Sequence, residues 1–377
     1  MNEKQRKLSI GTSFALASAW FGTHCGSGFA TGAQATSFWV KYGAHAIYLP
    51  IISAIIMAAV AVIMWELIRL TGSETYRQYA DELFRPYHKV FGLIYEILFI
   101  GIMVMGVSAV FAGAGELMAQ ALGWNYVLCV ILFIALTVVL TMFGSNVIRN
   151  SASVLSTILI VVIAVCTIIG MCAPNAHLGE VVRTWDTEYS AGSAIWSAIL
   201  YASFQCVILG STVNMAGGLK TTGDVKASGL LGFAMNCVMM VLLTYMLLSF
   251  YPETTGETLA VLAILNSIGK PWLSTAYSLM LFLAFITTAI SCIGSLTTRF
   301  ELLSKDLIKK DTVRRFVFSL GIILICFGLA QFGLLNIIKK GYNAVGYLGI
   351  PFVILPTLIL GPMKIKKLRA QRSEETR

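Results

Sequence analysis

Charged residues are scarce in this sequence, and the patterns that would indicate a soluble enzyme are missing. Asp, Glu, Lys and Arg make up 12% of the 377 residues, against 57% hydrophobic residues. A soluble globular domain carries roughly 25% charged residues, so this composition excludes one. The chain has no CxxC pair, no Cys/His metal spacing and no cofactor fingerprint. No nucleophile, base and orienting carboxylate cluster together, so we expect neither an enzyme nor a cofactor.

Ten stretches of the chain are long and apolar enough to cross a membrane, which takes roughly 20 residues. The predicted spans are 9–40, 46–70, 88–121, 125–145, 151–172, 191–216, 227–250, 272–303, 312–334 and 341–361. Because they leave no room for a soluble domain, we predict an all-α membrane protein with a single transmembrane domain over 1–377. The run LAVLAILNSIG, within 251–271, predicts a short extra helix over the outer face that either forms a lid or packs at the interface.

Basic residues are distributed unevenly between the two sides of the predicted topology. The formal net charge is +9, a property that membrane proteins share with nucleic-acid-binding proteins. Five of the 27 Lys and Arg fall on the outer side, namely Lys41, Arg183, Lys270, Lys339 and Lys340. The remaining residues, 27 minus 5 or 22, fall on the inner side, including the basic tail over 362–377. This asymmetry predicts cytoplasmic termini and leaves no basic stripe for nucleic acid.

The first span is unlike a continuous lipid-facing helix. Its middle holds four glycines and three polar residues, namely Gly22, Gly26, Gly28, Gly32, Thr23, His24 and Ser27. Glycine weakens a helix, and irregular backbone at membrane depth is tolerated only where protein or water meets its polar groups. We therefore predict that Gly22 to Gly28 is unwound and lines a cavity. The alternative is a glycine-rich helix packed closely on its neighbours, with His24 either a hydrogen-bonded core residue or a ligand.

The sixth span repeats this pattern in a weaker form. Ser203 and Gln205 are predicted to interrupt an apolar helix about halfway along, and Gly210 follows them. Interrupted helices one and six of ten divide the chain into two five-helix repeats, at about 9–172 and 191–361. Such a pair of breaks is typical of an inverted-repeat transporter that binds its solute between them.

The eighth span contains a candidate cation site. Ala284, Thr287 and Thr288 are spaced i, i+3 and i+4, so they share one face of a helix. A hard cation such as Na⁺ takes several oxygen ligands at once, and two hydroxyls on one face could combine with carbonyls from an unwound helix. The alternative is that each threonine hydroxyl bonds back to a carbonyl of its own helix.

Four short motifs give the chain a specific resemblance. They are G-x-G-F-A-[ST]-G at Gly26 to Gly32, A-G-x-G at Ala112 to Gly115, Tyr-Ala-Ser-aromatic at Tyr201 to Phe204, and T-T-A-I-S at Thr287 to Ser291. In their order and spacing the chain resembles LeuT-fold transporters of the amino acid–polyamine–organocation superfamily, and within it the bacterial YkvI-like membrane proteins. The resemblance implies a LeuT-like 5+5 inverted repeat in a bacterial inner membrane.

The resemblance also implies a sodium site between helices one and eight. Its ligands would be three carbonyls and two hydroxyls, from Gly22, Cys25, Ala284, Thr287 and Thr288. A second sodium site of the family uses an Asn where this chain has Phe29, so a second ion is not expected. Proton-coupled relatives place a Lys in helix five, and none occurs in the predicted fifth span, which favours Na⁺ over H⁺.

These observations predict a sodium-coupled symporter that takes up an amino acid or related amine by alternating access. The predicted solute site comprises Thr23, His24, Gly26, Ser27, Gly28, Ser203, Phe204, Gln205 and Ser291. The partners would be a small organic solute, Na⁺ or H⁺ and membrane lipid. The alternatives are a proton-coupled transporter, one for a nucleobase-like or hydantoin-like ring, and a membrane sensor without net transport. Glu66, Glu96 and Glu116 lie near span boundaries, and Glu116 is the candidate for coupling or gating.

Overall fold

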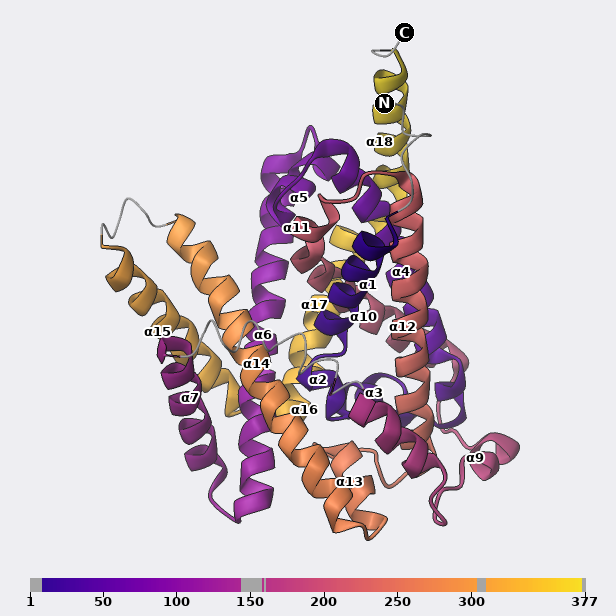
Figure 1. The fold of residues 1–377 in the computed structure, drawn as a ribbon. Helices are drawn as coiled ribbons and strands as arrows, with labels where there is room; N and C mark the ends of the chain where they lie inside the picture. Colours follow the sequence, from indigo (N-terminus) through magenta and orange to yellow (C-terminus); the bar gives the residue numbers. More distant parts are fainter. Residues whose placement is uncertain (1–8, 144–157, 159–160, 304–309, 375–377) are drawn as a thin grey trace.

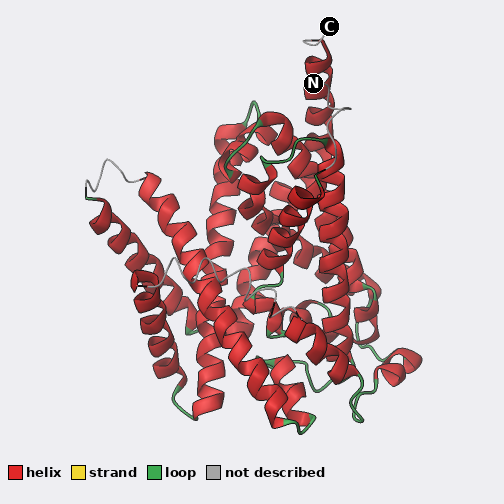
Figure 2. Cartoon of the chain, viewed as in Figure 1, coloured by secondary structure: helices red, strands yellow, loops and turns green. Residues whose placement is uncertain are grey.

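The computed structural model describes residues 9–143, 158, 161–303 and 310–374, and within them every regular element is helical (Figures 1 and 2). The first half contains α1 (Ile10–His24), α2 (Ser27–Ala30), α3 (Ala33–Phe38), the 3₁₀ segment η2 (Val40–Ile47), α4 (Leu49–Thr71), α5 (Tyr76–Phe84), α6 (His88–Leu122), α7 (Tyr126–Phe143) and an apolar helix over Val161–Met171. The second half contains α9 (Leu178–Thr184), α10 (Ala191–Ile208), the 3₁₀ segment η3 (Leu209–Thr212), α11 (Val213–Ala216), α12 (Thr222–Leu248), α13 (Ala260–Ser267), α14 (Pro271–Leu303), α15 (Asp311–Ala330), α16 (Leu334–Asn336), the π-helical η4 (Ile337–Tyr342), α17 (Asn343–Gly349), the π-helical η5 (Ile350–Ile354) and α18 (Leu355–Glu374).

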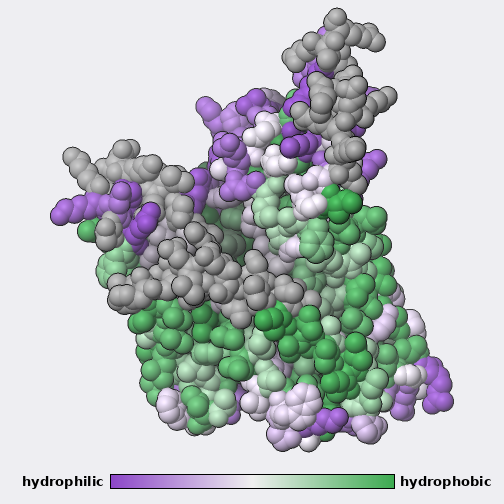
Figure 3. Space-filling view, viewed as in Figure 1, coloured by the Kyte–Doolittle hydropathy of each residue, from purple (hydrophilic) through white to green (hydrophobic). Residues whose placement is uncertain are grey.

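Seven of the described helical stretches are long and apolar enough to cross a membrane. They are Leu49–Thr71, His88–Leu122, Ala191–Ala216, Thr222–Leu248, Pro271–Gly294, Val313–Ala330 and Leu334–Arg372. Tyr126–Leu140 and Val161–Met171 are shorter apolar helices, and most of the predicted fifth span before Val161 lies outside the described residues. On the face shown in Figure 3, hydrophobic residues cover the middle of the molecule and hydrophilic residues gather towards its two ends. The protein is therefore a multi-pass membrane protein.

The long helices pack in two groups, which can be followed in Figure 1. In one group α10 and α12 pack on α4, and α1 packs on α12. In the other group α7, α14 and α15 pack on α6. The short helix α2 packs on α14 and so connects the groups. α18 finishes and α1 begins at the same end of the molecule, which we call the terminus end; α13 lies at the other end, the α13 end.

The first apolar stretch is divided into short helices. α1 ends at His24, and the N–H of Cys25 still donates to the carbonyl of Phe21 at 2.7 Å. α2 and α3 follow, separated by Gly32 in the left-handed region at φ 84°. A Cβ on Gly32 would lie 3.1 Å from the side chain of Val261 in α13, so both its conformation and its surroundings require glycine.

The predicted short helix within 251–271 is present as α13, and it packs against this divided stretch. The N–H of Val261 donates to the carbonyl of Thr31 at 3.2 Å. On the neighbouring α14 the hydroxyl of Tyr277 donates to the carbonyl of Ala30. The backbone at the turn after α2 is therefore bonded from two sides, by α13 and by α14.

The prediction that Ser203 and Gln205 interrupt the sixth span was wrong. α10 stays α-helical through Ile208, and the geometry changes only at η3, one turn later. The reason is that both polar side chains find partners without unwinding their helix. Ser203 donates to the carbonyl of Gly346 in α17 at 2.7 Å, and the Gln205 amide donates to the hydroxyl of Tyr201 at 3.3 Å.

Candidate functional site

A buried polar network lies where α1 ends, and His24 is its centre. His24 is 3% exposed. Its Nδ1 lies 2.6 Å from Oδ1 of Asn236 in α12, and its Nε2 lies 2.7 Å from the hydroxyl of Tyr201 in α10. Asn236 directs its amide nitrogen to the carbonyl of Gly232 at 2.7 Å, so its Oδ1 must accept from His24. This places the proton on Nδ1 and leaves Nε2 to accept from Tyr201.

The network continues into two glutamine side chains beside the break. The Gln205 amide donates to Tyr201 at 3.3 Å and to Oε1 of Gln34 in α3 at 3.5 Å. The Gln34 amide nitrogen would lie 3.1 Å from a Cβ on Gly28, so glycine leaves room for it there. Side chains from α1, α3, α10 and α12 thus converge on one buried point next to the non-helical residues 25–26.

Aromatic rings enclose the network on one side. The ring centroids of Trp39 and Tyr201 lie 4.3 Å apart. Phe204 packs between Phe38 at 5.3 Å and Tyr342 of η4 at 4.9 Å. Phe204 is fully buried in this cluster, so in this conformation it contributes to the wall of the network.

The structure brings some of the predicted solute-site residues together and separates others. His24 and Gln205 meet through Tyr201, and Gly28 lies against Gln34. Thr23 is exposed, and its hydroxyl donates to the carbonyl of Trp20 in the same helix at 2.9 Å. Ser203 turns towards α17, Gly26 precedes α2, and Ser291 is exposed on α14. The side chain of Ser27 lies outside the described residues.

Three members of the network were not predicted from the sequence: Gln34, Tyr201 and Asn236. Asn236 could have been found, because it is a lone amide in the apolar run GFAMNCVMMV and polar groups inside a membrane are rare and functional. Tyr201 belongs to a recognised motif, but its place on the helix face towards His24 required the structure. Gln34 is brought to the site by the turn at Gly32.

The predicted sodium ligands lie on two helices from different packing groups. Gly22 and Cys25 are at the end of α1, which packs on α12, whereas α14 packs on α6. Ala284 and Thr287 are buried, and Thr288 is partly exposed. The hydroxyl of Thr287 donates to the carbonyl of Ala284 in its own helix at 3.1 Å, which is the alternative considered for this residue.

A cavity of about 230 Å³ lies towards the terminus end, between α6, α14 and the irregular end of the sixth span. Its wall includes Tyr76, Phe99, Gly210, Asn214 and Arg299. Gly210 allows a close approach there, because a Cβ would lie 2.9 Å from the ring of Phe99. Burial raises the pKa of Tyr76, so its phenol stays neutral at physiological pH. This cavity thus lies at the end opposite to α13.

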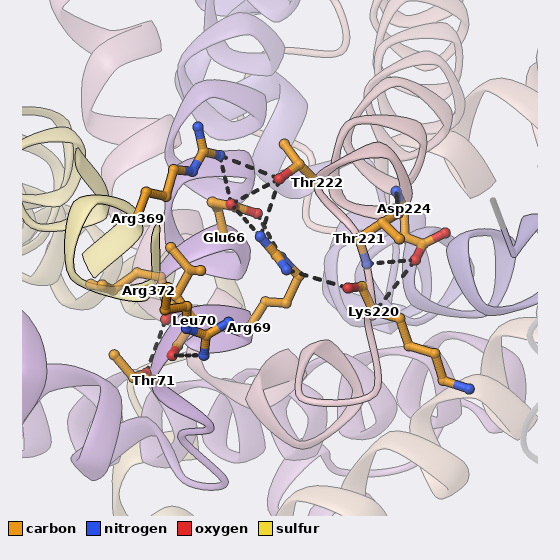
Figure 4. A network of polar contacts seen from close by, with 11 residues as sticks. Glu66, Arg69, Leu70, Thr71, Lys220, Thr221, Thr222, Asp224, Arg369 and Arg372 are labelled. Atoms are coloured by element: carbon orange, nitrogen blue, oxygen red, sulfur yellow. Dashed lines mark hydrogen bonds and ion pairs between the residues drawn. The ribbon is translucent and has the colours of Figure 1, made fainter. Parts of the chain in front are cut away.

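Two of the three boundary carboxylates are ion-paired. Glu96 accepts hydrogen bonds from Arg77 of α5 at 2.8 Å and from Arg299 of α14. Glu66 is held by Arg69 at 2.7 Å and by Arg369 of α18 at 2.6 Å (Figure 4). Glu116 accepts a hydrogen bond from Gln120, one turn later in α6, at 2.9 Å. Glu66 and Glu96 therefore join helices at the terminus end.

Comparison with solved structures identifies the fold. A manganese transporter from Eremococcus coleocola superposes with a TM-score of 0.59 at 14% identity, over 95% of this chain and 84% of the other. MhsT in complex with L-phenylalanine gives 0.58 at 15% identity, over 97% and 99%. Mhp1, a nucleobase-cation-symport-1 family transporter with bromovinylhydantoin bound, gives 0.56 at 14%, over 98% and 94%. The chain has the LeuT fold.

No family model and no curated protein matches the sequence, so the likeness shows the LeuT fold alone. The coverage shows that this fold extends over nearly the whole chain. The three neighbours differ in their ligands: the manganese transporter is in complex with an aromatic bis-isothiourea substituted compound, MhsT with L-phenylalanine and Mhp1 with bromovinylhydantoin. One fold hosts many functions, and the LeuT fold therefore leaves the solute of this chain to be inferred from its own site.

Proposed function

We propose that this protein is a secondary active transporter that takes up a small organic solute, an amino acid or a related amine, with Na⁺ as the coupling ion. The observation that carries the proposal is the buried network of His24, Asn236 and Tyr201 at the end of α1, within a fold shared with three transporters. Placing a polar group inside a membrane costs free energy, and such groups mark solute and ion pathways.

The proposed solute site adjoins the break after α1. Freed backbone amides at Gly26 and Gly28 suit a carboxylate, while Phe204 and the rings around it suit an apolar side chain or a cationic group. Tyr201 and Gln205 would fix the solute's orientation by hydrogen bonds. A nucleobase-like or hydantoin-like ring is the second candidate, favoured by the same aromatic wall.

The proposed mechanism is alternating access. In this conformation α13 is bonded to the turn after α2, and the cavity beside Gly210 lies at the terminus end. Na⁺ would draw α1 towards α14 by binding to the carbonyls of Gly22, Cys25 and Ala284 and to the two threonine hydroxyls. One inward charge yields about 2.3 kcal/mol per 100 mV, and a tenfold solute gradient needs about 1.4 kcal/mol.

The finer assignments belong to this proposal. We place the chain among the YkvI-like proteins of the amino acid–polyamine–organocation superfamily, with ten spans in a 5+5 inverted repeat and a break in helix one. Both termini would lie in the cytoplasm of a bacterium, as the distribution of Lys and Arg indicates. Glu116 is retained as the candidate for coupling because its carboxylate accepts a hydrogen bond from an uncharged side chain, that of Gln120.

Sodium is expected to stabilise the purified protein, and the two threonines are expected to be required. A ligand that binds only the folded state at 100 times its Kd adds about 2.7 kcal/mol. Thermal unfolding in detergent should therefore shift upwards in Na⁺ relative to K⁺ at matched ionic strength, and Thr287→Ala with Thr288→Ala should abolish the shift. Ser274→Ala removes a half-buried hydroxyl of the same helix that donates to the carbonyl of Pro271, and it is the matched control. Equal curves in Na⁺ and K⁺ would exclude sodium coupling.

Transport itself is tested by flux into proteoliposomes. With an inward Na⁺ gradient, we expect accumulation of a radiolabelled amino acid from a screened set, and dissipation of the gradient should stop it. A sensor with this fold would bind the same solute without net flux. Uptake driven by a pH gradient in the absence of Na⁺ would instead support the proton-coupled alternative, with Glu116→Gln as the first variant to examine.

A further inference from the structure

A groove at the terminus end lies between three helices and outside the proposed transport path. α4 forms its floor, and α12 and α18 form its walls. Its volume is about 390 Å³. Val62 and Ile63 line the floor, Val225 and Ile365 line the walls, and two lysines, Lys226 and Lys366, stand on opposite sides. The groove therefore combines an apolar interior with two positive charges.

Two glycines bring the walls close to the floor. A Cβ on Gly229 of α12 would lie 2.2 Å from the side chain of Val62, and a Cβ on Gly361 of α18 would lie 2.4 Å from that of Ile63. These distances are shorter than real side-chain contacts allow, so both positions need glycine. The groove is consequently a fixed feature of how α12 and α18 pack on α4.

The charges in the groove leave a net positive potential. Glu66 in the groove is already ion-paired with Arg69 and Arg369 (Figure 4). Lys226 and Lys366 are both exposed, and neither ammonium group makes a hydrogen bond or ion pair with the part of the chain that the structure describes. Among the described residues that line the groove, three cations, Lys226, Lys366 and Arg369, thus accompany one carboxylate. This arrangement attracts an anion rather than a metal ion or an amine.

From the two lysines towards the membrane centre, the same faces of α12 and α18 become strongly apolar. On α12, Leu230 lies one turn from Lys226 towards the membrane centre and is 70% exposed. On α18, Met363 and Ile359 lie one and two turns from Lys366 and are 65% and 58% exposed. Residues at these spacings share a helix face. Each wall therefore presents a positive charge at the membrane boundary and a hydrocarbon surface beneath it.

We propose that this groove binds an anionic phospholipid. The phosphodiester would lie between Lys226 and Lys366, and the acyl chains would run along Leu230 and Met363. Basic pockets between spanning helices on one side of a membrane are typical headgroup sites, and the apolar faces exclude a fully soluble anion as the preferred ligand. The bound lipid would bridge α12 and α18 across α4. The inference does not depend on which solute the protein carries.

The test is native mass spectrometry of the detergent-purified protein with phosphatidylglycerol and with phosphatidylcholine. Each lysine near a headgroup contributes about a fivefold factor, so Lys226→Gln with Lys366→Gln should weaken phosphatidylglycerol binding about 30-fold. Binding of phosphatidylcholine should change less than twofold. Lys339→Gln with Lys340→Gln, which removes two exposed charges on η4, is the matched control and should leave both lipids unaffected.

Several outcomes would overturn the proposal. One is an equal loss of phosphatidylglycerol affinity in the control variant, which would mean that overall charge and not the groove determines binding. Another is equal affinity of the wild type for the two lipids. A third is displacement of phosphatidylglycerol by an equal concentration of glycerol 3-phosphate, which would assign the site to a soluble phosphate ester. If the double variant unfolds, the two single variants replace it, and each is expected to lose phosphatidylglycerol affinity about fivefold.

Discussion

Replacing Glu66 by Ala is expected to destabilise the protein by about 3 to 5 kcal/mol, because removal of one partner from a buried ion pair leaves its counter-charges uncompensated. The Glu66 side chain is 5% exposed, and it bonds to Arg69, Arg369 and the hydroxyl of Thr222. These partners come from α4, α18 and the first residue of α12 (Figure 4). The variant therefore loses the contact that holds three helices together at the terminus end.

Thermal unfolding in detergent measures this effect, with Glu180→Ala as the control. Glu180 is an exposed carboxylate on α9, and a surface substitution of this kind is expected to stay within about 0.5 kcal/mol. Glu66→Gln retains hydrogen-bonding oxygen without charge and should give an intermediate loss. A Glu66→Ala protein as stable as the wild type would show that the arginines find other partners, and would remove the cluster's structural role.

Replacing His24 by Ala is expected to destabilise the protein by about 2 to 5 kcal/mol and to abolish solute uptake. The change leaves Oδ1 of Asn236 and the hydroxyl of Tyr201 without His24, and an unsatisfied buried polar group costs about 1 to 3 kcal/mol. Both groups are buried. The break after α1 would lose its bonds to α10 and α12, so the solute site would lose its geometry as well.

Two further variants separate the structural effect from a role in binding. His88→Ala removes an imidazole near the surface whose Nδ1 lies 3.2 Å from the carbonyl of Pro86, and its stability should change by about 0.5 kcal/mol or less. Tyr201→Phe removes one hydroxyl and should give a smaller loss than His24→Ala. If His24→Ala is fully stable and transports at the wild-type rate, the buried network neither stabilises the fold nor belongs to the transport path.

Much of the architecture could be predicted from the sequence, because the length of an apolar stretch and its glycine content are local properties. Most spans match their helices within a few residues, and the non-helical backbone at Cys25 and Gly26 falls inside the predicted unwound segment. The prediction for the sixth span failed because two of the hydrogen-bond partners are distant in the sequence. Ser203 bonds to a residue 143 positions away, and Gln205 bonds to Tyr201 within the span and to a residue 171 positions away.

The candidate site was predictable in part for the same reason. His24 was identified from its place in the glycine-rich run, but its partner Asn236 lies 212 residues further along the chain. Whether a hydroxyl such as that of Thr287 faces an ion or its own helix carbonyl depends on a rotation of one side chain. Sequence spacing fixes the helix face and leaves that rotation open.

The ion cluster around Glu66 also has a consequence for biogenesis. Glu66 and Arg369 are 303 residues apart, so α4 leaves the ribosome long before α18. Before α18 is synthesised, Arg69, three residues away, is the one cation of this cluster that Glu66 can bind. The ion pair between α4 and α18 therefore forms last, with a helix from the other end of the chain. Synthesis that stops before residue 369 yields a protein in which α4 lacks this link to the C-terminal helix.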